Sequence, residues 1–466
     1  MANATASSLR PFGLRDKVSY AFGDIANDCT FILSSTFLLK FYTDVMGIDA
    51  VVVGIMMMVA RCVDAVTDMT MGRIVDLTKP GKAGKFRPWI LRGSGLVAIM
   101  SFLMYPVWFQ DMSLAFKTVW MFVTYLLWGS VFYTMVNIPY GSMASAITPE
   151  PTQRTQLSVY RNAGATIASL AISAGVPMIV YYQDANGNQI FNGSTFSIVA
   201  LVFSIAAILC YFVCYFGSTE RVKIAPPAKD SKAPKTNFVR NLVTNRALLA
   251  IIVAAIFLLL SQLTITSMAQ YVFPNFYRNI PAQSTAATIG SLGILALSPV
   301  ATPLAKKFGK KELSVIGALV GAASYLICFL VRPQNVWVFV AFYVIAYLGM
   351  GVFNILIWAC IIDVIDYSEV KNHIREDGTI YSCYSFARKL GQAASSGLSG
   401  ALITMVGYTD ATKFDPEVTN GIFNIACLVP VIGFVLVALT LIFLYPLSRK
   451  VVESNSAELE RRRAEK

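Results

Sequence analysis

Long apolar stretches alternate with short polar segments along nearly the whole chain. A helix that spans a membrane needs about 20 mostly apolar residues, whereas a membrane strand is about 10 residues long and alternates apolar with polar positions. The length and continuity of the stretches therefore predict helices. Twelve are predicted, at 19–44, 51–75, 89–109, 117–141, 157–182, 196–218, 246–271, 286–305, 313–332, 337–363, 379–406 and 420–446. The predicted fold class is an all-α polytopic membrane protein.

The longest polar connection separates six predicted helices from the other six. It covers 219–245 and is rich in proline and lysine, which is typical of a flexible linker. We expect an N-terminal six-helix bundle at 1–218, a C-terminal six-helix bundle at 246–448 and a tail at 449–466.

A faint internal repeat favours the same division. Basic loops, at 72–87 and 306–311, follow the second predicted helix of each half. The alternative explanation is that any short cytoplasmic loop tends to be basic. The matching placement favours two six-helix halves related about an axis along the membrane normal, which is the major facilitator arrangement.

Composition narrows the class of protein. Of the 466 residues, 56% are hydrophobic and 14% are charged, against about 25% charged in a soluble domain. This excludes a disordered chain and argues against a soluble enzyme. The eight cysteines lie in apolar stretches without a Cys-x-x-Cys pair, and His373 is the single histidine, so no disulfide framework or zinc site is expected. The first 18 residues are polar, so we expect no cleavable signal peptide.

The basic residues indicate the orientation in the membrane. With the N-terminus inside, the inward segments hold 30 of the 38 Lys and Arg, and the outward loops hold four. This asymmetry predicts a multi-pass protein of the cell inner (plasma) membrane with both termini in the cytoplasm. The net charge of +12 fits this bias and anionic membrane lipid, and nucleic acid is not an expected partner.

The second predicted helix contains charged residues at membrane depth. Asp64 and Asp68 are four residues apart and share a face, which Arg61 joins, and Thr67 adds a hydroxyl beside them. Carboxylate and hydroxyl oxygens suit a small hard cation, and a carboxylate pair can also hold a proton. The alternative is a structural ion-pair network. Because one acid suffices to neutralise Arg61, we favour a cation site.

Three further helices carry polar groups within or beside apolar stretches. In the first, Asn27 and Asp28 offer hydrogen-bonding groups for a polyol, whereas Asp24 is expected near the helix start, where it opposes the helix dipole. Arg161, near the start of the fifth helix, is either an interfacial anchor or a ligand contact. In the eleventh, Arg388 and Lys389 are adjacent, and Lys389 is expected to neutralise the acids of the second helix or to contact a ligand.

The segment 363–377 is dense in charges of both signs. It is either an ordinary solvated turn or a cytoplasmic gate whose ion pairs break on opening. No Walker A motif, nucleophile elbow or His-Glu-x-x-His motif is present, so an ATP-driven pump is not supported, and a membrane-embedded enzyme would have only the buried acids and the lysine as reactive groups.

The chain resembles the glycoside–pentoside–hexuronide:cation symporters, whose best-known member is the bacterial melibiose permease. The matching stretches lie in both halves: Lys40–Asp44, Ala60–Asp68, Gly84–Trp89, Asn137–Ser142, Asp366–Glu369 and Ala387–Lys389. Asn137–Ser142 and Ser385–Gln392 are closer to the glucuronide-transporter branch.

The resemblance implies cation-coupled sugar transport and assigns residues to it. It implies that the cation-binding positions are Asp64, Asp68, Thr67, Thr134 and Asp28. It implies that the substrate-binding positions are Asp28, Asn27, Asn137, Arg161, Lys389, Tyr384 and Asn354. It implies that a gating or charge network contains Arg61, Asp363 and Arg375. If the cation is sodium, Asp64 and Asp68 are its metal ligands.

The chain departs from melibiose permease at several of these positions. Thr67 replaces an asparagine that supports sodium binding, which puts sodium in doubt and favours protons. Asn137 replaces a sugar-binding aspartate, Asn27 replaces a lysine, and Gly141 and Asn354 replace tryptophans. A less negative pocket that keeps Arg161 and Lys389 suits a substrate with a carboxylate, such as a glucuronide.

The function expected from the sequence is proton- or sodium-coupled import of a glycoside or hexuronide by alternating access. The protein is then not an enzyme, needs no cofactor beyond the coupling ion, binds a sugar, a monovalent cation and membrane lipid, and acts as a monomer. The alternatives are symport of a galactoside, xyloside or sulfosugar, a passive facilitator, and a membrane protein that modifies or moves lipid.

Overall fold

The computed structural model describes residues 10–81, 83–222, 245–372 and 377–464. Its described residues form two compact units. The first is drawn from Met1–Asp49, Val59–Tyr182 and Ile190–Ser231, and the second from Ala50–Met58, Gln183–Gln189 and Lys232–Lys466.

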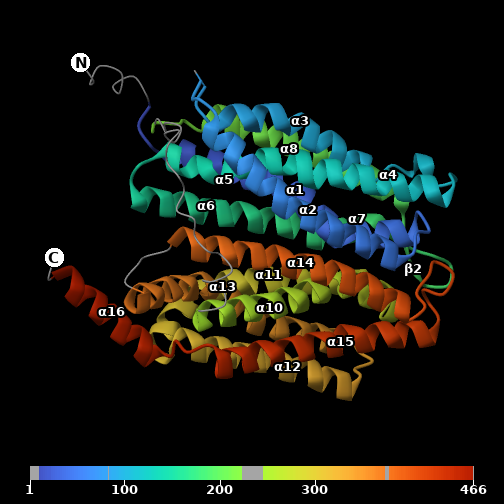
Figure 1. The fold of residues 1–466 in the computed structure, drawn as a ribbon. Helices are drawn as coiled ribbons and strands as arrows, with labels where there is room; N and C mark the ends of the chain where they lie inside the picture. The colour runs from blue at the N-terminus through green and yellow to red at the C-terminus, as the bar shows by residue number, and fades with distance from the viewer. Residues whose placement is uncertain (1–9, 82, 223–244, 373–376, 465–466) are drawn as a thin grey trace. The chain divides into compact units, whose positions relative to one another are not determined.

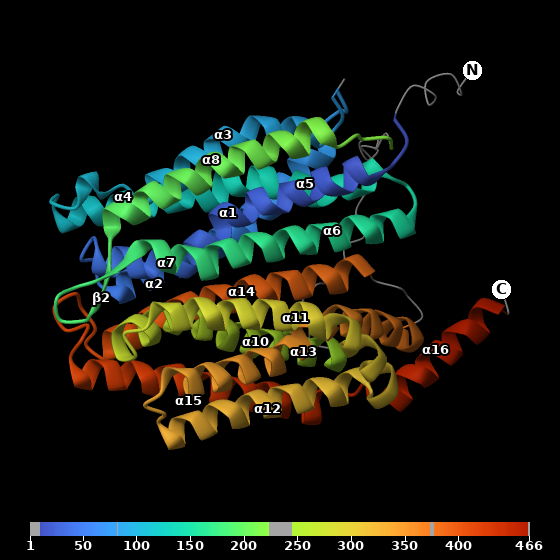
Figure 2. The ribbon, with the colours of Figure 1, turned by 180° about the vertical axis from the view of Figure 1, so that it is seen from behind.

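The first unit contains the following helices and strands. They are α1 (Leu14–Asp44), α2 (Ala50–Leu77), α3 (Arg87–Leu103), η1 (Val107–Phe109), α4 (Leu114–Leu126), η2 (Leu127–Tyr133), α5 (Thr134–Ile147), α6 (Pro151–Leu170), η3 (Ala171–Gly175), α7 (Val176–Val180), β1 (Tyr181–Gln183), β2 (Gln189–Phe191) and α8 (Gly193–Gly217). The first nine residues of α2 and the turn between the two strands group with the second unit. Helices α1 and α8 lie side by side (Figure 1, Figure 2).

The second unit is all helical apart from that turn. Its elements are α10 (Arg246–Tyr271), η4 (Val272–Phe276), α11 (Ile280–Phe308), α12 (Lys310–Val331), α13 (Val336–Asn372), α14 (Asp377–Met405), α15 (Pro416–Leu439), η5 (Thr440–Leu444) and α16 (Arg449–Ala464). Helices α11 and α12 are separated only by Gly309, whose φ of 105° is a backbone conformation that favours glycine.

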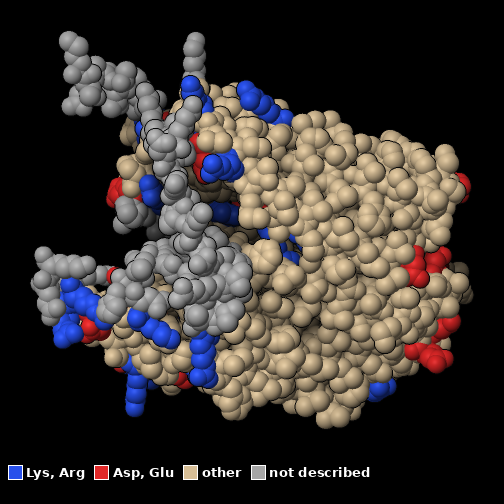
Figure 3. All heavy atoms as spheres, viewed as in Figure 1, with Lys and Arg blue, Asp and Glu red and all other residues tan. Residues whose placement is uncertain are grey.

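The predicted fold class is confirmed. Over the described residues, twelve long helical segments coincide with the twelve predicted spans, and nine of them are long and apolar enough to cross a membrane. The other three are α1 and α14, which carry many polar side chains, and α3, which has only 17 residues. On the face of the second unit seen in Figure 3, Lys and Arg gather around α16 at one end, and uncharged side chains cover the middle. The chain is a multi-pass membrane protein.

Two helix boundaries differ from the prediction. Helix α1 begins at Leu14, so Asp24 lies almost three turns inside it. Because the dipole effect falls off within the first turn, the expectation that Asp24 opposes the helix dipole is wrong. Helix α13 continues to Asn372, past the predicted end at 363. Its charged residues are compatible with a helix that extends beyond the apolar span, so the first part of the predicted loop is helical.

The N-terminus of α3 is held by a carboxylate from the end of α8. Both oxygens of Glu220 accept backbone N–H groups, from Lys85 at 2.7 Å, Phe86 at 2.9 Å and Arg87 at 2.8 Å. A Cβ at Gly84 would lie 2.4 Å from the carboxyl carbon of Glu220, so only glycine fits there without a shift. A negative charge at a helix N-terminus is favourable, and this contact fixes the start of the central connection to the first unit.

Candidate functional site

Two hydroxyl groups face the two acids of α2. Ser130, in the π-helical segment η2, donates to Asp64 Oδ1 at 2.5 Å, and Thr134, the first residue of α5, donates to Asp68 Oδ1 at 2.9 Å. The acids are four residues apart on α2, and the hydroxyls are four residues apart where η2 continues into α5, so they meet as two parallel pairs. Asp64, Ser130 and Thr134 are buried. This arrangement gathers four oxygen-bearing side chains inside the first unit.

Arg61 is paired with one of these acids. Its Nη1 lies 3.3 Å from Asp64 Oδ2, and both side chains are about one-tenth exposed. The guanidinium also lies over the ring of Phe31, 4.9 Å from its centre, and Phe31 stacks on Tyr133 at 5.7 Å. An ion pair and a cation–π contact therefore hold Arg61 beside the acids.

Thr67 lies on the same helix but its hydroxyl is turned to the backbone. It donates to the carbonyl oxygens of Val63 and Asp64, both at 3.2 Å. The structure therefore does not place the Thr67 hydroxyl proton on either carboxylate. Its cation-binding role stays a prediction.

A second polar cluster lies on α1. Arg161 Nε donates to Asp24 Oδ1 at 2.8 Å, and the guanidinium lies over the ring of Tyr140 at 5.5 Å. Asp28, one turn further along α1, has no hydrogen bond or ion pair with any described residue. Because no described residue donates to the Asp28 carboxylate, both of its oxygens can accept hydrogen bonds from a ligand with hydroxyl groups.

The two predicted asparagines meet beside this cluster. Asn27 Nδ2 lies 3.4 Å from Asn137 Oδ1, and Tyr211 donates to Asn27 Oδ1 at 2.7 Å. The amide of Asn27 is therefore oriented by α8 and α5 together.

The two clusters share one face of α1. Asp24, Asp28 and Phe31 follow one another at spacings of four and three, which places them in a row along a helix. Because Arg61 lies over Phe31, this row connects the Arg161 pair to the acids of α2. The structure thus brings most of the predicted positions of the first half beside one face of α1, and the row Asp24, Asp28 and Phe31 on that face forms the α1 track.

The second unit holds the other predicted positions. Asn354 lies half-buried in α13, and Tyr384 in α14 is fully buried, with its hydroxyl 3.2 Å from Arg388 Nη1. Lys389 follows in α14 and is half-buried. Its predicted proximity to the acids of α2 concerns the other unit and stays a prediction.

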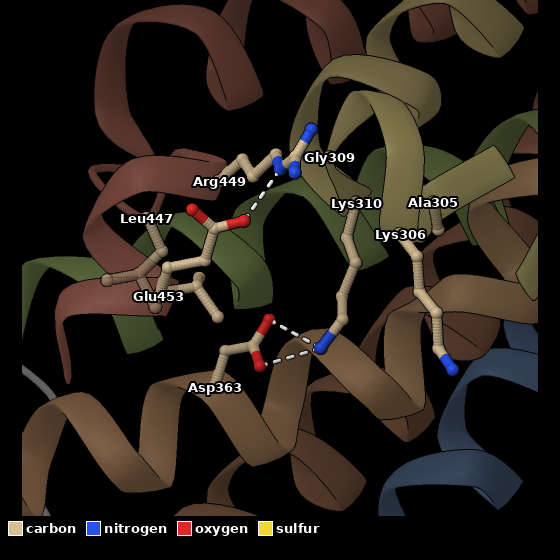
Figure 4. A pocket seen from close by; sticks show the side chains of 9 residues that line it. Ala305, Lys306, Gly309, Lys310, Asp363, Leu447, Arg449 and Glu453 are labelled. Carbon is tan, nitrogen blue, oxygen red and sulfur yellow. Dashed lines mark hydrogen bonds and ion pairs between the residues drawn. The ribbon is translucent and has the colours of Figure 1, made fainter. Parts of the chain in front are cut away.

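Asp363 belongs to a charge pair that the sequence did not identify. Lys310 Nζ lies 2.7 and 2.9 Å from the two oxygens of Asp363. The pair borders a cavity of about 290 Å³, shown in Figure 4, which Arg449 and Glu453 close from the side of α16. Arg375, the predicted partner in the charge network, lies outside the described residues.

Three other contacts were missed by sequence reasoning. Ser130 is one small residue in an apolar stretch, and only the π-helical turn directs it to Asp64. Asp24 and Arg161 are 137 positions apart, so no spacing relates them. The sequence marks Arg388 as a charge within a helix, but its contact with the ring of Trp358 arises from the packing of α13 on α14.

The oxygen-rich site suits a monovalent cation or a proton. Two carboxylates and two hydroxyls supply hard oxygen ligands without sulfur or imidazole. Over the residues that the structure describes, no group of three or more His, Cys, Asp or Glu is placed to hold a metal ion. The side chains present are compatible with ion binding and with hydrogen bonding to hydroxyl groups.

Comparison with known proteins identifies the family. The model of the family described as MFS/sugar transport protein matches residues 19–449. An uncharacterized symporter of Bacillus subtilis, YjmB, is 33% identical, with 93% of each chain covered. The glucuronide carrier protein homolog of Escherichia coli is 31% identical, with 96% of each chain covered. A putative sulfoquinovose importer of Escherichia coli is 30% identical, covering 94% of this chain and 91% of that protein.

Solved structures share the fold at low identity. A bacterial homolog of the human lysosomal transporter Spinster, in an inward-facing and unoccupied conformation, has a TM-score of 0.66 with 12% identity, covering 95% of this chain and 97% of that one. Fold, family model and relatives agree with the resemblance read from the sequence. The chain belongs to the MFS/sugar transport protein family.

Proposed function

We propose that this protein is a symporter of the inner membrane that couples the entry of a proton or a sodium ion to the import of a hexuronide, such as a glucuronide. It acts as a monomer by alternating access, with both termini in the cytoplasm. The single observation that carries the proposal is the pairing of Asp64 and Asp68 with Ser130 and Thr134.

The coupling follows from the charge of these side chains. An ionised carboxylate within the membrane costs about 2.5–3.5 kcal/mol on insertion scales, so neutralising it by a cation favours closure of the site. Asp64 is paired with Arg61, and the proposed cation binds among the oxygens of Asp64, Asp68 and their hydroxyl partners. An inward cation gains about 2.3 kcal/mol per 100 mV, which supports a roughly 40–50-fold accumulation of a neutral sugar at that voltage. A hexuronide carries one negative charge, so its complex with one cation is electrically neutral, and the concentration gradient of the cation drives its uptake.

The sugar is proposed to bind along the α1 track. The Asp28 carboxylate accepts hydrogen bonds from sugar hydroxyls, and Asn27 with Asn137 offers amide donors and acceptors. Because Arg61 lies over Phe31, three residues from Asp28, occupancy of the cation site is transmitted to the sugar site through α1.

Two relatives support an anionic sugar as the substrate. One is named as a glucuronide carrier homolog and another as a sulfoquinovose importer. The second name makes a sulfosugar the second candidate substrate. Both sugars carry one negative charge at the acidic group.

The test is uptake into inside-positive and inside-negative proteoliposomes with sodium and pH gradients imposed separately. The substrate panel contains a β-glucuronide, a sulfonated glucoside and the matching neutral glucoside. The proposal expects uphill uptake of the glucuronide driven by one of the two ion gradients. Accumulation that ignores both gradients, or modification of lipid in place of sugar uptake, would contradict it.

A further inference from the structure

Arg388 is a cation in the body of a membrane helix. It lies 11 residues after the first residue of α14 and 17 before the last, and it is half-buried. A guanidinium at such depth is costly and is usually paired or functional. The groups that contact the Arg388 guanidinium therefore bear on its role.

Two aromatic side chains flank the guanidinium. Tyr384, one turn before Arg388 on α14, accepts a hydrogen bond from Nη1 at 3.2 Å. Trp358, on α13, meets Tyr384 edge-on at 5.1 Å, and the guanidinium carbon lies 5.8 Å from the Trp358 ring centre and 5.9 Å from that of Tyr384. Cation–π attraction and one hydrogen bond hold the side chain in place.

No carboxylate accompanies it. Among the residues that the structure describes, no Asp or Glu oxygen lies within 4 Å of Arg388. Three other cations within long helices differ in this respect. Their ion pairs are Arg61 with Asp64 at 3.3 Å, Arg161 with Asp24 at 2.8 Å and Lys40 with Asp44 at 2.8 Å.

The N–H donors of the Arg388 guanidinium are therefore available to an anion from outside the protein. A guanidinium has five N–H donors in a planar arrangement that matches a carboxylate with two parallel hydrogen bonds. Tyr384 is the acceptor of one donor, and no other described side chain or carbonyl accepts from the remaining ones. One guanidinium balances one negative charge, which fits a carboxylate better than a phosphate monoester with a charge of about −1.5 to −2.

We infer that Arg388, oriented by Tyr384 and Trp358, binds the carboxylate of the transported sugar. This inference rests on the proposed function and assigns the acid-recognising residue within it. Lys389 does not reproduce this role, because an ammonium lacks the planar fork.

The test compares two ligands that differ only at the acidic group. Binding of 4-nitrophenyl β-D-glucuronide and 4-nitrophenyl β-D-glucoside to the full-length protein in detergent is measured by calorimetry, and uptake is measured in proteoliposomes. The variants are Arg388→Gln, which removes the charge, and Arg388→Lys, which keeps the charge without the fork. Arg246→Gln is the matched control, because Arg246 is exposed at the start of α10 and donates to the carbonyls of Phe443 and Leu444.

The ratio of the two affinities is the readout. Arg388→Gln is expected to lower the preference for the glucuronide at least tenfold, Arg388→Lys to lower it less, and Arg246→Gln to keep the wild-type ratio. An unchanged ratio, or a parallel loss of both ligands as expected for a merely structural contact, overturns the inference while glucuronide uptake by the wild type still supports the proposed function. A wild-type protein that binds and accumulates no glucuronide contradicts the proposed function and the inference with it.

Discussion

The hydroxyl of Ser130 donates to Asp64 across 2.5 Å, and this contact joins a π-helical turn of the fourth membrane segment to the charged face of the second. Four residues on, Thr134 and Asp68 repeat the contact at 2.9 Å. Because π-helical turns are often found at functional positions, the local widening of η2 fits a helix that is shaped around these acids.

Ser130→Ala is expected to shift cation binding in a direction that depends on the ion. The Ser130 hydroxyl donates to the ionised Asp64 carboxylate, and such a bond contributes about 1.5–3 kcal/mol, so its loss favours protonation, whereas a sodium ion loses an oxygen ligand. The ion concentration for half-maximal uptake should therefore change roughly 10- to 100-fold, downward for protons and upward for sodium. Ser142→Ala is the matched control, because its exposed hydroxyl donates to Ile138 O on its own helix. Sodium and proton titrations of uptake check this, and equal behaviour of the two variants would contradict it.

Asp28→Asn is expected to reduce sugar affinity without unfolding the protein. The variant loses a charged acceptor for sugar hydroxyls, which should lower affinity roughly 10- to 100-fold. Because Asp28 has no hydrogen bond or ion pair with a described residue, the melting temperature should stay constant or rise. Ligand calorimetry and thermal melts measure the two effects, and a large loss of stability would show that Asp28 has a structural partner.

Arg161→Gln should destabilise the first unit by leaving Asp24 without its partner. Breaking a fully buried pair costs about 3–5 kcal/mol, and a smaller loss is expected here because Arg161 is 40% exposed. The double variant Asp24→Asn/Arg161→Gln should recover much of the melting temperature and still fail to transport. Full recovery of transport in the double variant would reduce the pair to a structural contact.

Glu220→Gln should loosen the attachment of the central connection. Glutamine keeps one acceptor oxygen and loses the other, so one charge-assisted contact to the N-terminus of α3 disappears, at a cost of about 1.5–3 kcal/mol. Glu417→Gln, at an exposed site in the first turn of α15, is the control. Thermal melts in detergent compare the two variants, and identical melting temperatures would mean that the contact of Glu220 with the N-terminus of α3 contributes nothing to stability.

The helices were predictable because each membrane span leaves a long apolar stretch in the sequence. The helix ends were less predictable, because the polar residues that extend a helix beyond the membrane are not distinguished by hydrophobicity from the residues of a loop. Helix α1 begins five residues before the predicted start, and this moves Asp24 from the helix end to the interior. The misplaced boundary produced the wrong explanation for Asp24.

Within the candidate site, the residues on one helix were accessible to sequence reasoning and the contacts between helices were not. The spacing of Asp64 and Asp68 reveals a shared face, since both follow the helix period. Ser130 and Arg161 reach their partners through packing of distant segments, which no spacing encodes. That Arg388 has no carboxylate within reach among the described residues depends on the packing of its neighbours, which the sequence does not reveal.

The most direct test of the central claim is concentrative uptake by Asp64→Asn and Asp68→Asn in proteoliposomes with an imposed ion gradient and a membrane potential. Both variants are expected to reach no more than the external sugar concentration, while exchange of internal for external sugar continues. If either variant still accumulates the sugar above the external concentration as the wild type does, Asp64 and Asp68 do not form the binding site of the coupling ion.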